Sequence, residues 1–215
     1  MVLNKKLLAE FIGTCSLLIV VVGSGIMGES LAQGNAAIAL LANSLATGAG
    51  LYAFIQCFGH ISGAHFNPVV SFTEFLWNKM SFKEFAQYSI VQIIGGITGV
   101  ILTHAMFGKA LLQLSQHDRG DFRFFISEVI ATFGLITVIA LSGRKNVEAT
   151  PTAVSLFITS AYWCTSSTSF ANPAVTIARG LTDTFSGILW TGVPGFILAQ
   201  FIGAYISYWI ARFLT

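Results

Sequence analysis

The chain has 215 residues, of which 54% are hydrophobic and only 9% are charged. This composition is typical of an integral membrane protein and excludes an ordinary soluble domain. The formal net charge is +2 and the basic residues do not cluster, so no nucleic-acid partner is expected.

Long runs without Asp, Glu, Lys or Arg mark the expected membrane spans, since one spanning helix needs roughly 20 consecutive apolar residues. Each of four runs supplies the core of one span: 11–28, 85–107, 129–143 and 184–211. Two further runs, 30–73 and 149–178, are too long for one span, and each is interrupted by an Asn-Pro pair. We therefore expect each of them to form one full span and then a half helix that returns into the membrane.

The basic residues between the spans predict the orientation. With the N-terminus inside, six spans place most of them on the cytoplasmic side: Lys5, Lys6, Lys79, Lys83, Arg144, Lys145 and Arg212. The outer side then receives Lys109, Arg119, Arg123 and Arg179. This distribution follows the positive-inside rule. We therefore expect both termini in the cytoplasm and the protein in the plasma (inner) membrane.

Three short motifs recur in the same order in the two halves of the chain. The pairs are 9–14 with 127–132, 67–70 with 172–175, and 92–96 with 200–204. They indicate a duplicated unit, at about 5–108 and about 122–214, within a single domain over 1–215. Each unit holds three spans and one half helix. Because three is odd, the second unit must lie inverted in the membrane.

Each Asn-Pro pair predicts the start of a half helix. Asparagine is a good N-cap and proline suits the first helical position, as in Asn67-Pro68 and Asn172-Pro173. Inversion of the repeats brings the two starts together near the midplane, where each N-terminus carries about half an elementary charge. Such a centre orients a neutral hydrogen-bonding solute and repels cations, protons included.

These features resemble the aquaporin and aquaglyceroporin channels, the major intrinsic protein family. The resemblance rests on the paired Asn-Pro motifs, the stretch GHISGAHFNP at 59–68, two glutamates that open spans, and two Gln-led glycine motifs. It implies an all-α membrane protein with six transmembrane helices and two re-entrant half helices around one pore per subunit, usually in tetramers. It also implies a structural task for Glu10 and Glu128, which would hydrogen-bond the loops before the half helices.

The resemblance further implies a passive channel in the lipid bilayer, with small neutral solutes as its partners. Neither a cofactor nor a metal site is expected, and no arrangement of catalytic residues indicates an enzyme.

Two departures from the family pattern concern the pore. Most members have Ala after both Asn-Pro pairs, whereas this chain has Val69 in the first and Ala174 in the second. We interpret Val69 as a packing adjustment. Members also usually have Arg three residues after the second asparagine, and this chain has Val175 there.

Counting along the family pattern places the other filter positions at Thr47, Ser160 and Ser169. Together with Val175 they predict a wide filter that is lined by hydroxyl groups and carries no charge. Water-selective members use bulky aromatic and His groups at the first two positions, and neither occurs here.

Charged residues and histidines mark the expected vestibules. On the helix face of Asn172, Arg179 lies roughly 10 Å away toward the outer mouth. Glu74 lies correspondingly at the inner mouth, and His60 and His65 flank the cytoplasmic entrance. The alternative is that Arg179 and Glu74 are charged helix ends that reach the headgroups, with Arg179 paired to Asp183.

The wide filter predicts passage of trivalent metalloid hydroxides such as arsenous acid and related arsenicals, with glycerol and water as further solutes. The tract FANPAVTIARGLTDTFSG at 170–187 also resembles the microbial aquaporins found with arsenic-resistance genes, in which Val likewise replaces the filter Arg. A water or glycerol facilitator without a metalloid role is the alternative. A secondary active transporter and a non-conducting structural membrane protein are less favoured.

Overall fold

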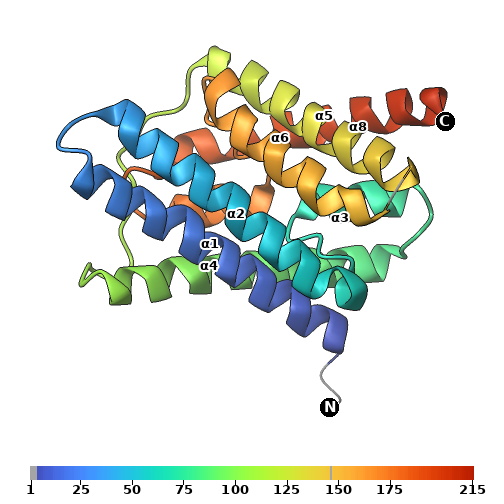
Figure 1. Ribbon diagram of the computed structural model, residues 1–215, viewed down its shortest axis with the longest axis horizontal. Helices are drawn as coiled ribbons and strands as arrows, with labels where there is room; N and C mark the ends of the chain where they lie inside the picture. Colours follow the sequence, from blue (N-terminus) through green and yellow to red (C-terminus); the bar gives the residue numbers. More distant parts are fainter. Residues whose placement is uncertain (1–3, 146) are drawn as a thin grey trace.

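The computed structural model describes residues 4–145 and 147–215. Its long helices run side by side, and both ends of the chain lie toward the same side of the bundle in Figure 1. The α-helices are α1 (Lys5–Leu31), α2 (Ala36–Ser62), α3 (Pro68–Leu76), α4 (Phe82–Met106), α5 (Phe122–Lys145), α6 (Thr150–Cys164), α7 (Pro173–Arg179) and α8 (Val193–Leu214). Two short 3₁₀ helices are η1 (Val147–Ala149) and η2 (Trp190–Gly192).

Within the described residues, five helices have the length and apolar composition of a membrane span: α1, α2, α4, α5 and the segment Trp190–Leu214. The sixth expected span, α6, has 15 residues, which is shorter than the roughly 20 that were predicted. Its start at Thr150 agrees with the apolar run 149–178, and it is short because it ends at Cys164.

The last span begins later than the apolar run predicts. The run starts at residue 184, whereas α8 starts at Val193, with Pro194 in its first turn. The residues before it form turns that pack back on α7, and the Ile188 N–H donates to the carbonyl of Arg179 at 3.3 Å.

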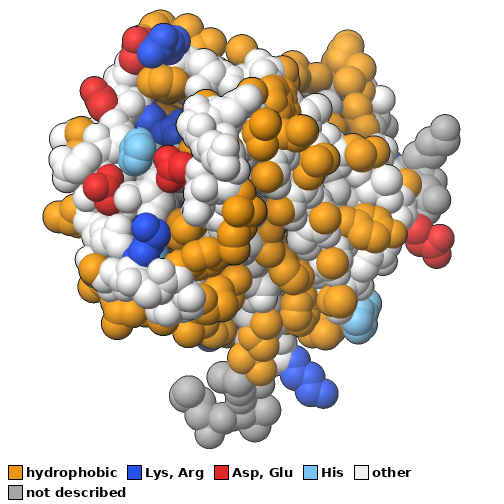
Figure 2. All heavy atoms as spheres, turned by 60° about the vertical axis from the view of Figure 1, so that its left-hand side comes forward, with side chains coloured by type: hydrophobic (Ala, Val, Ile, Leu, Met, Phe, Trp, Pro, Cys, Tyr) orange, Lys and Arg blue, Asp and Glu red, His pale blue; other side chains and the backbone are white. Residues whose placement is uncertain are grey.

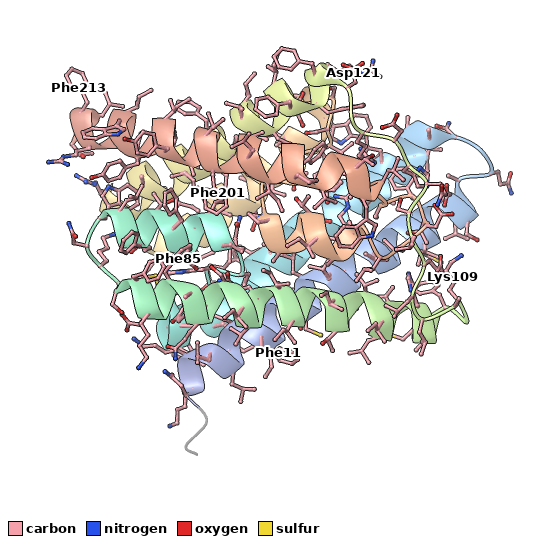
Figure 3. All side chains as sticks on the ribbon, turned by 180° about the vertical axis from the view of Figure 1, so that it is seen from behind. Phe11, Phe85, Lys109, Asp121, Phe201 and Phe213 are labelled. Carbon is pink, nitrogen blue, oxygen red and sulfur yellow. The ribbon has the colours of Figure 1, made fainter. Side chains whose placement is uncertain are left out.

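The two halves of the chain pack in the same way. In the first half, α1 lies between α2 and α4, and in the second half α5 lies between α6 and α8. The half helices α3 and α7 lie end to end between α4 and α8, as Figure 3 shows. Phe72 of α3 contacts Phe85 of α4 and Phe201 of α8, with ring centroids 6.0 and 5.2 Å apart. Each half helix is thus held by both halves of the chain.

Glycines let the helix backbones approach within each half. A Cβ on Gly95 would overlap the carbonyl oxygen of Phe11 on α1, and one on Gly203 would overlap that of Val129 on α5. These two glycines belong to the recurring Gln-led motifs. The repeat of that motif therefore has a packing reason.

The outer flank of the bundle is apolar. Figure 2 shows charged side chains gathered at one end of the molecule, with hydrophobic side chains covering the adjoining flank. Large exposed apolar residues include Ile94, Leu102, Ile130, Leu156, Leu198, Ile202 and Ile206. Such a surface suits a hydrocarbon environment and is too extensive for a water-exposed monomer.

Candidate functional site

The N-termini of α3 and α7 meet inside the bundle through their capping asparagines. Asn67 accepts from the Val69 N–H at 3.0 Å, and Asn172 accepts from the N–H groups of Ala174 and Val175 at 3.0 and 3.3 Å. Each side chain also donates across the junction, Asn67 to the carbonyl of Ala171 and Asn172 to that of Phe66, both at 2.8 Å. One N–H of each amide is used in this contact, and a carboxamide carries two.

The prolines occupy the first helical position of each half helix, where a missing N–H costs nothing. The residues that follow them are fully buried. Val69 packs in a cluster with Ile136 and Ala204, and Ala174 is likewise at 0% exposure.

Glu10 and Glu128 hold the loops that lead into the half helices. Glu10 accepts from Ser62 Oγ at 2.6 Å, from the backbone N–H groups of His65 and Phe66, and from Gln92 at 2.8 Å. The side chains of Glu10 and Glu128 are both fully buried, so these donors depend on the carboxyl groups for a hydrogen-bond acceptor.

The second glutamate repeats the pattern in the other half. Glu128 accepts from Ser167 Oγ at 2.6 Å, from the N–H groups of Phe170 and Ala171, and from Gln200 at 2.6 Å. These are the hydrogen bonds that the family resemblance implies.

The same loops carry backbone strain. Ala64 and Phe66 have φ values of 49° in the loop before α3, and Ser169 and Ala171 have 50° and 48° in the loop before α7. Non-glycine residues in this region cost about 1–3 kcal/mol each. The glutamate hydrogen bonds to Phe66 and Ala171 stabilise that conformation, which turns the chain into the helix start.

A cavity of about 270 Å³ runs along the junction. Its wall comes from α1, α2, α5 and α6, from the two half helices and from the loops before them. Among the residues singled out from the sequence, those that line it are Thr47, His65, Asn67, Glu74, Ser169, Asn172, Val175 and Arg179. A second hollow of about 600 Å³ shares Glu74, Ile139 and Thr150 with it and opens beside Trp77 and Arg144.

One expected filter residue, Ser160, and one expected vestibule residue, His60, do not line the cavity. Ser160 is exposed on the outer side of α6, and its hydroxyl donates to the carbonyl of Phe157 at 2.7 Å. The prediction at this position was wrong because counting back from Asn172 assumed a longer loop after α6. His60 is also exposed on α2 and does not line the cavity, whereas His65 does, with Nδ1 3.0 Å from Ser71 Oγ.

Tyr162 takes the place that was expected for Ser160. It lies on α6, is buried, and lines the cavity with its hydroxyl 3.3 Å from Thr47 Oγ1. It was not among the residues predicted from the sequence. The available signal was helical spacing. Tyr162 lies one turn after Ile158 and two turns after Val154 on α6, and both of these apolar residues line the same wall.

Arg179 is buried, with 3% exposure, and the ion pair that the described residues give to Asp183 is with His117. Its Nε donates to the carbonyl of Ser186, and its guanidinium carbon lies 3.4 Å from the centre of the Phe170 ring. Asp183 instead accepts from the Gln116 N–H at 2.9 Å. The structure therefore does not show the alternative, a helix end that pairs with Asp183, and Arg179 lines the cavity.

A second arginine reaches Phe170 from the connection between α4 and α5. Arg119 donates from Nε to the carbonyl of Gly187 at 2.9 Å and from Nη1 to that of Ser167 at 3.2 Å, and its guanidinium carbon lies 5.2 Å from the Phe170 ring. Burial lowers the pKa of Arg119, and the charge of Glu128 opposes that effect. Nothing in the sequence pattern of this connection marked Arg119.

The end of the cavity beside Glu74 carries opposite charges. Glu74 lines it and lies 3.3 Å from the ammonium group of Lys79, which is largely exposed. The Lys79 ammonium also lies 5.0 Å from the centre of the Trp77 ring. The acid at this mouth is thus partly neutralised, unlike the two arginines at the other end.

Comparison with known proteins agrees with this architecture. The sequence model of the major intrinsic protein family matches residues 1–210. The chain is 44% identical to aquaglyceroporin AqpS of Rhizobium meliloti (strain 1021) over 99% of its own length and 91% of that protein. It is 30% identical to aquaporin AqpM of Methanothermobacter marburgensis, over 99% and 98% of the two chains.

A solved structure has the same fold. The X-ray structure of the aquaglyceroporin from Plasmodium falciparum superposes with a TM-score of 0.78, covering 96% of this chain and 94% of that one, at 19% identity. The all-α membrane architecture expected from the sequence is therefore confirmed. The chain belongs to the major intrinsic protein family, whose members are passive channels of the membrane and not enzymes.

Proposed function

We propose that the protein is a passive channel for small neutral hydroxylated solutes, most of all trivalent metalloid hydroxides such as arsenous acid and related arsenicals. Glycerol and water are further solutes of the same pore. The observation that carries the proposal is Val175, an apolar side chain on the cavity wall where most family members have arginine. Thr47 and Ser169 add hydroxyl groups to the same wall.

The chemistry of the wall suits compact polyols. Arsenous acid and glycerol each carry three hydroxyl groups and bond in several directions. The cavity is mostly apolar and offers the amide groups of Asn67 and Asn172 beside the two helix N-termini. A neutral solute can exchange its water for these donors, whereas a cation meets the positive ends of two helix dipoles.

The relatives support a solute channel of this kind. AqpS and the protein of Plasmodium falciparum are both described as aquaglyceroporins. A water or glycerol facilitator without a metalloid role is the second candidate, and the name of AqpS favours glycerol as a solute.

We further propose that the whole chain, 1–215, is a single channel domain with both termini in the cytoplasm of a cell whose plasma membrane it crosses. Four copies would assemble as a homotetramer, each with its own pore. Apolar side chains on the flank, such as Ile130 and Leu156, would then face either lipid or a neighbouring copy. Light scattering of the purified protein with its detergent contribution subtracted would measure the number of copies.

Flux into proteoliposomes tests the proposed solutes. Swelling under gradients of glycerol or arsenous acid, compared with empty liposomes, measures permeability to each. We expect the native chain to pass both solutes. Val175→Arg should reduce the flux of both at least about tenfold, because a long charged side chain would project from the wall into the cavity. Val175→Leu is the matched control that enlarges the side chain without adding charge.

The outcomes separate the candidates. Glycerol and water flux without arsenous acid flux would favour the plain facilitator. Flux that disappears when the proton and sodium gradients are collapsed would indicate a secondary transporter. Absence of flux for every solute in vesicles that hold correctly folded protein would indicate a structural protein.

A further inference from the structure

The outer part of the cavity carries a positive charge although Val175 replaces the usual filter arginine. We propose that Arg179, one helical turn further along α7, supplies the filter charge in this protein, and that Arg119 positions it from the loop between α4 and α5. The inference rests on the proposed channel function and refines its selectivity. It replaces the expectation of an uncharged filter.

Side-chain direction makes this substitution possible. The Cα of Arg179 lies about 6 Å further along the helix axis than that of Val175. Side chains of a helix tilt toward its N-terminus, so a long side chain at the end of α7 runs back along the helix. The guanidinium carbon of Arg179 accordingly lies 3.4 Å from the ring centre of Phe170, two residues before Asn172.

Phe170 indicates where along the cavity the filter lies. It lines the cavity and directly follows Ser169, one of the expected filter positions, which lines the same wall. A guanidinium that stacks on this ring therefore lies beside the filter and not at the outer surface. The opposite wall at this end carries Tyr162 and Thr47, whose hydroxyl groups are 3.3 Å apart.

No ion pair among the described residues joins Arg179 to an acid, although Arg119 and Glu128 both lie close enough to act on it electrostatically. The ion pairs among the described residues join Glu74, Asp121 and Asp183 to other partners. The hydrogen bond that the structure gives to the Arg179 guanidinium uses Nε, and its acceptor is a neutral carbonyl. The side chain is buried apart from the cavity that it lines, so its Nη groups are directed at whatever occupies that cavity.

Arg119 acts on the same ring from the loop. Its two hydrogen bonds join the carbonyl of Ser167, before α7, to that of Gly187, after α7. It thereby ties together the two segments that flank Arg179 and adds a second positive charge near Phe170. We assign it as a positioning residue, since Arg179 and not Arg119 lines the cavity.

Two guanidinium groups at a buried site, neither of them in an ion pair with an acid among the described residues, repel cations and favour solutes with acceptor oxygens. Hydroxylated neutral solutes have such oxygens. A filter of this form therefore passes them and excludes sodium, ammonium-type cations and protons. An uncharged filter would leave cation exclusion to the two half-helix dipoles alone.

Cation leak in proteoliposomes tests the inference. The variant is Arg179→Gln, measured for sodium and methylammonium entry and for proton leak with a trapped pH dye, beside glycerol flux in the same vesicles. We expect cation entry to rise at least about tenfold over the native chain, with glycerol flux kept or increased. Arg123→Gln is the matched control, because Arg123 is exposed and pairs with Asp121.

Two further variants distinguish the loss of the filter charge from misfolding. Arg179→Lys keeps the charge and should keep cations out. In the Arg179→Gln background, Val175→Arg restores an arginine at the usual family position and should close the cation leak again. A leak that Val175→Arg does not close would indicate a loosened structure and would overturn the assignment.

The proposed function and this inference fail differently. A native chain that passes neither glycerol nor arsenous acid would overturn the proposed function. A native chain that passes them, while Arg179→Gln remains as tight to cations as the native chain, would overturn the inference alone. Arg119→Gln should show a smaller cation leak than Arg179→Gln, and a larger one would reverse the two assignments.

Discussion

Asn67 and Asn172 each donate a hydrogen bond to the carbonyl of the residue that precedes the other, at 2.8 Å in both directions. Each also caps its own half helix. One side chain therefore starts a helix and joins it to the opposite repeat. This reciprocal contact is what keeps two helix N-termini, which repel each other electrostatically, in line at the centre of the cavity.

Removal of this contact should weaken the protein more than removal of an ordinary cap. We expect Asn172→Ala to lower the free energy of unfolding by about 2–3 kcal/mol, because it loses a cap and a buried hydrogen bond. Thermal unfolding in detergent measures the effect. Asn35→Ala is the matched control, since Asn35 caps the exposed start of α2, and it should cost about 1 kcal/mol. Equal losses in the two variants would contradict the reading.

The buried glutamates should be intolerant of truncation. Glu128→Ala leaves the N–H groups of Phe170 and Ala171 without their acceptor beside a strained loop. Each unsatisfied buried donor costs about 1–3 kcal/mol, so we expect a severe loss of folded protein. Size-exclusion chromatography of solubilised membranes measures that loss. Glu74→Gln, at the partly exposed pair with Lys79, should change the yield little.

The close approach of α5 and α8 should make Gly203 irreplaceable. A methyl group there would overlap the carbonyl oxygen of Val129, so Gly203→Ala should destabilise the fold by about 1–3 kcal/mol or more. Gly195→Ala, on the same helix, meets open space and should be neutral or slightly stabilising. Melting temperatures of the two variants in one detergent check the contrast. A rise for both would show that helix propensity and not packing governs α8.

Val69 should affect packing and leave selectivity alone. Val69→Ala restores the residue that is usual in the family but opens a small void beside Ile136 and Ala204. We expect a loss of about 1–3 kcal/mol in stability and an unchanged ratio of glycerol to water flux. Val175→Ala, on the cavity wall, should instead raise glycerol flux relative to water. A changed flux ratio in Val69→Ala would place this residue in the selectivity of the pore.

Local features were predictable from the sequence. The apolar runs and the Asn-Pro pairs located α1, α4, α3 and α7, since a chain in hydrocarbon must satisfy its backbone within each helix and a helix start needs a cap. The repeat of the span-opening glutamates in the two halves was also visible in the sequence, and the family resemblance implied their hydrogen bonds to the loops before the half helices. These inferences need only spacing along one element or symmetry between two.

The side chains of the outer cavity could not be assigned in this way. Tyr162 and not Ser160 faces the cavity, because the loop between α6 and α7 is shorter than the count assumed. Arg119 comes from a connection with no periodic pattern. Its contacts with Ser167 and Gly187 depend on the path of that connection over α7.

Arg179 shows which features follow from the sequence alone and which require the tertiary structure. By itself the sequence determined the span pattern, the two helix starts and the face of α7 on which Val175 and Arg179 both lie, because these follow from hydropathy, capping and helix periodicity. Only the tertiary structure decided that the Arg179 guanidinium turns back onto Phe170, away from Asp183 and the headgroups. The physical reason is that a long side chain is directed by the groups that fold against it, here the Phe170 ring and the Ser186 carbonyl, which lie in other segments of the chain.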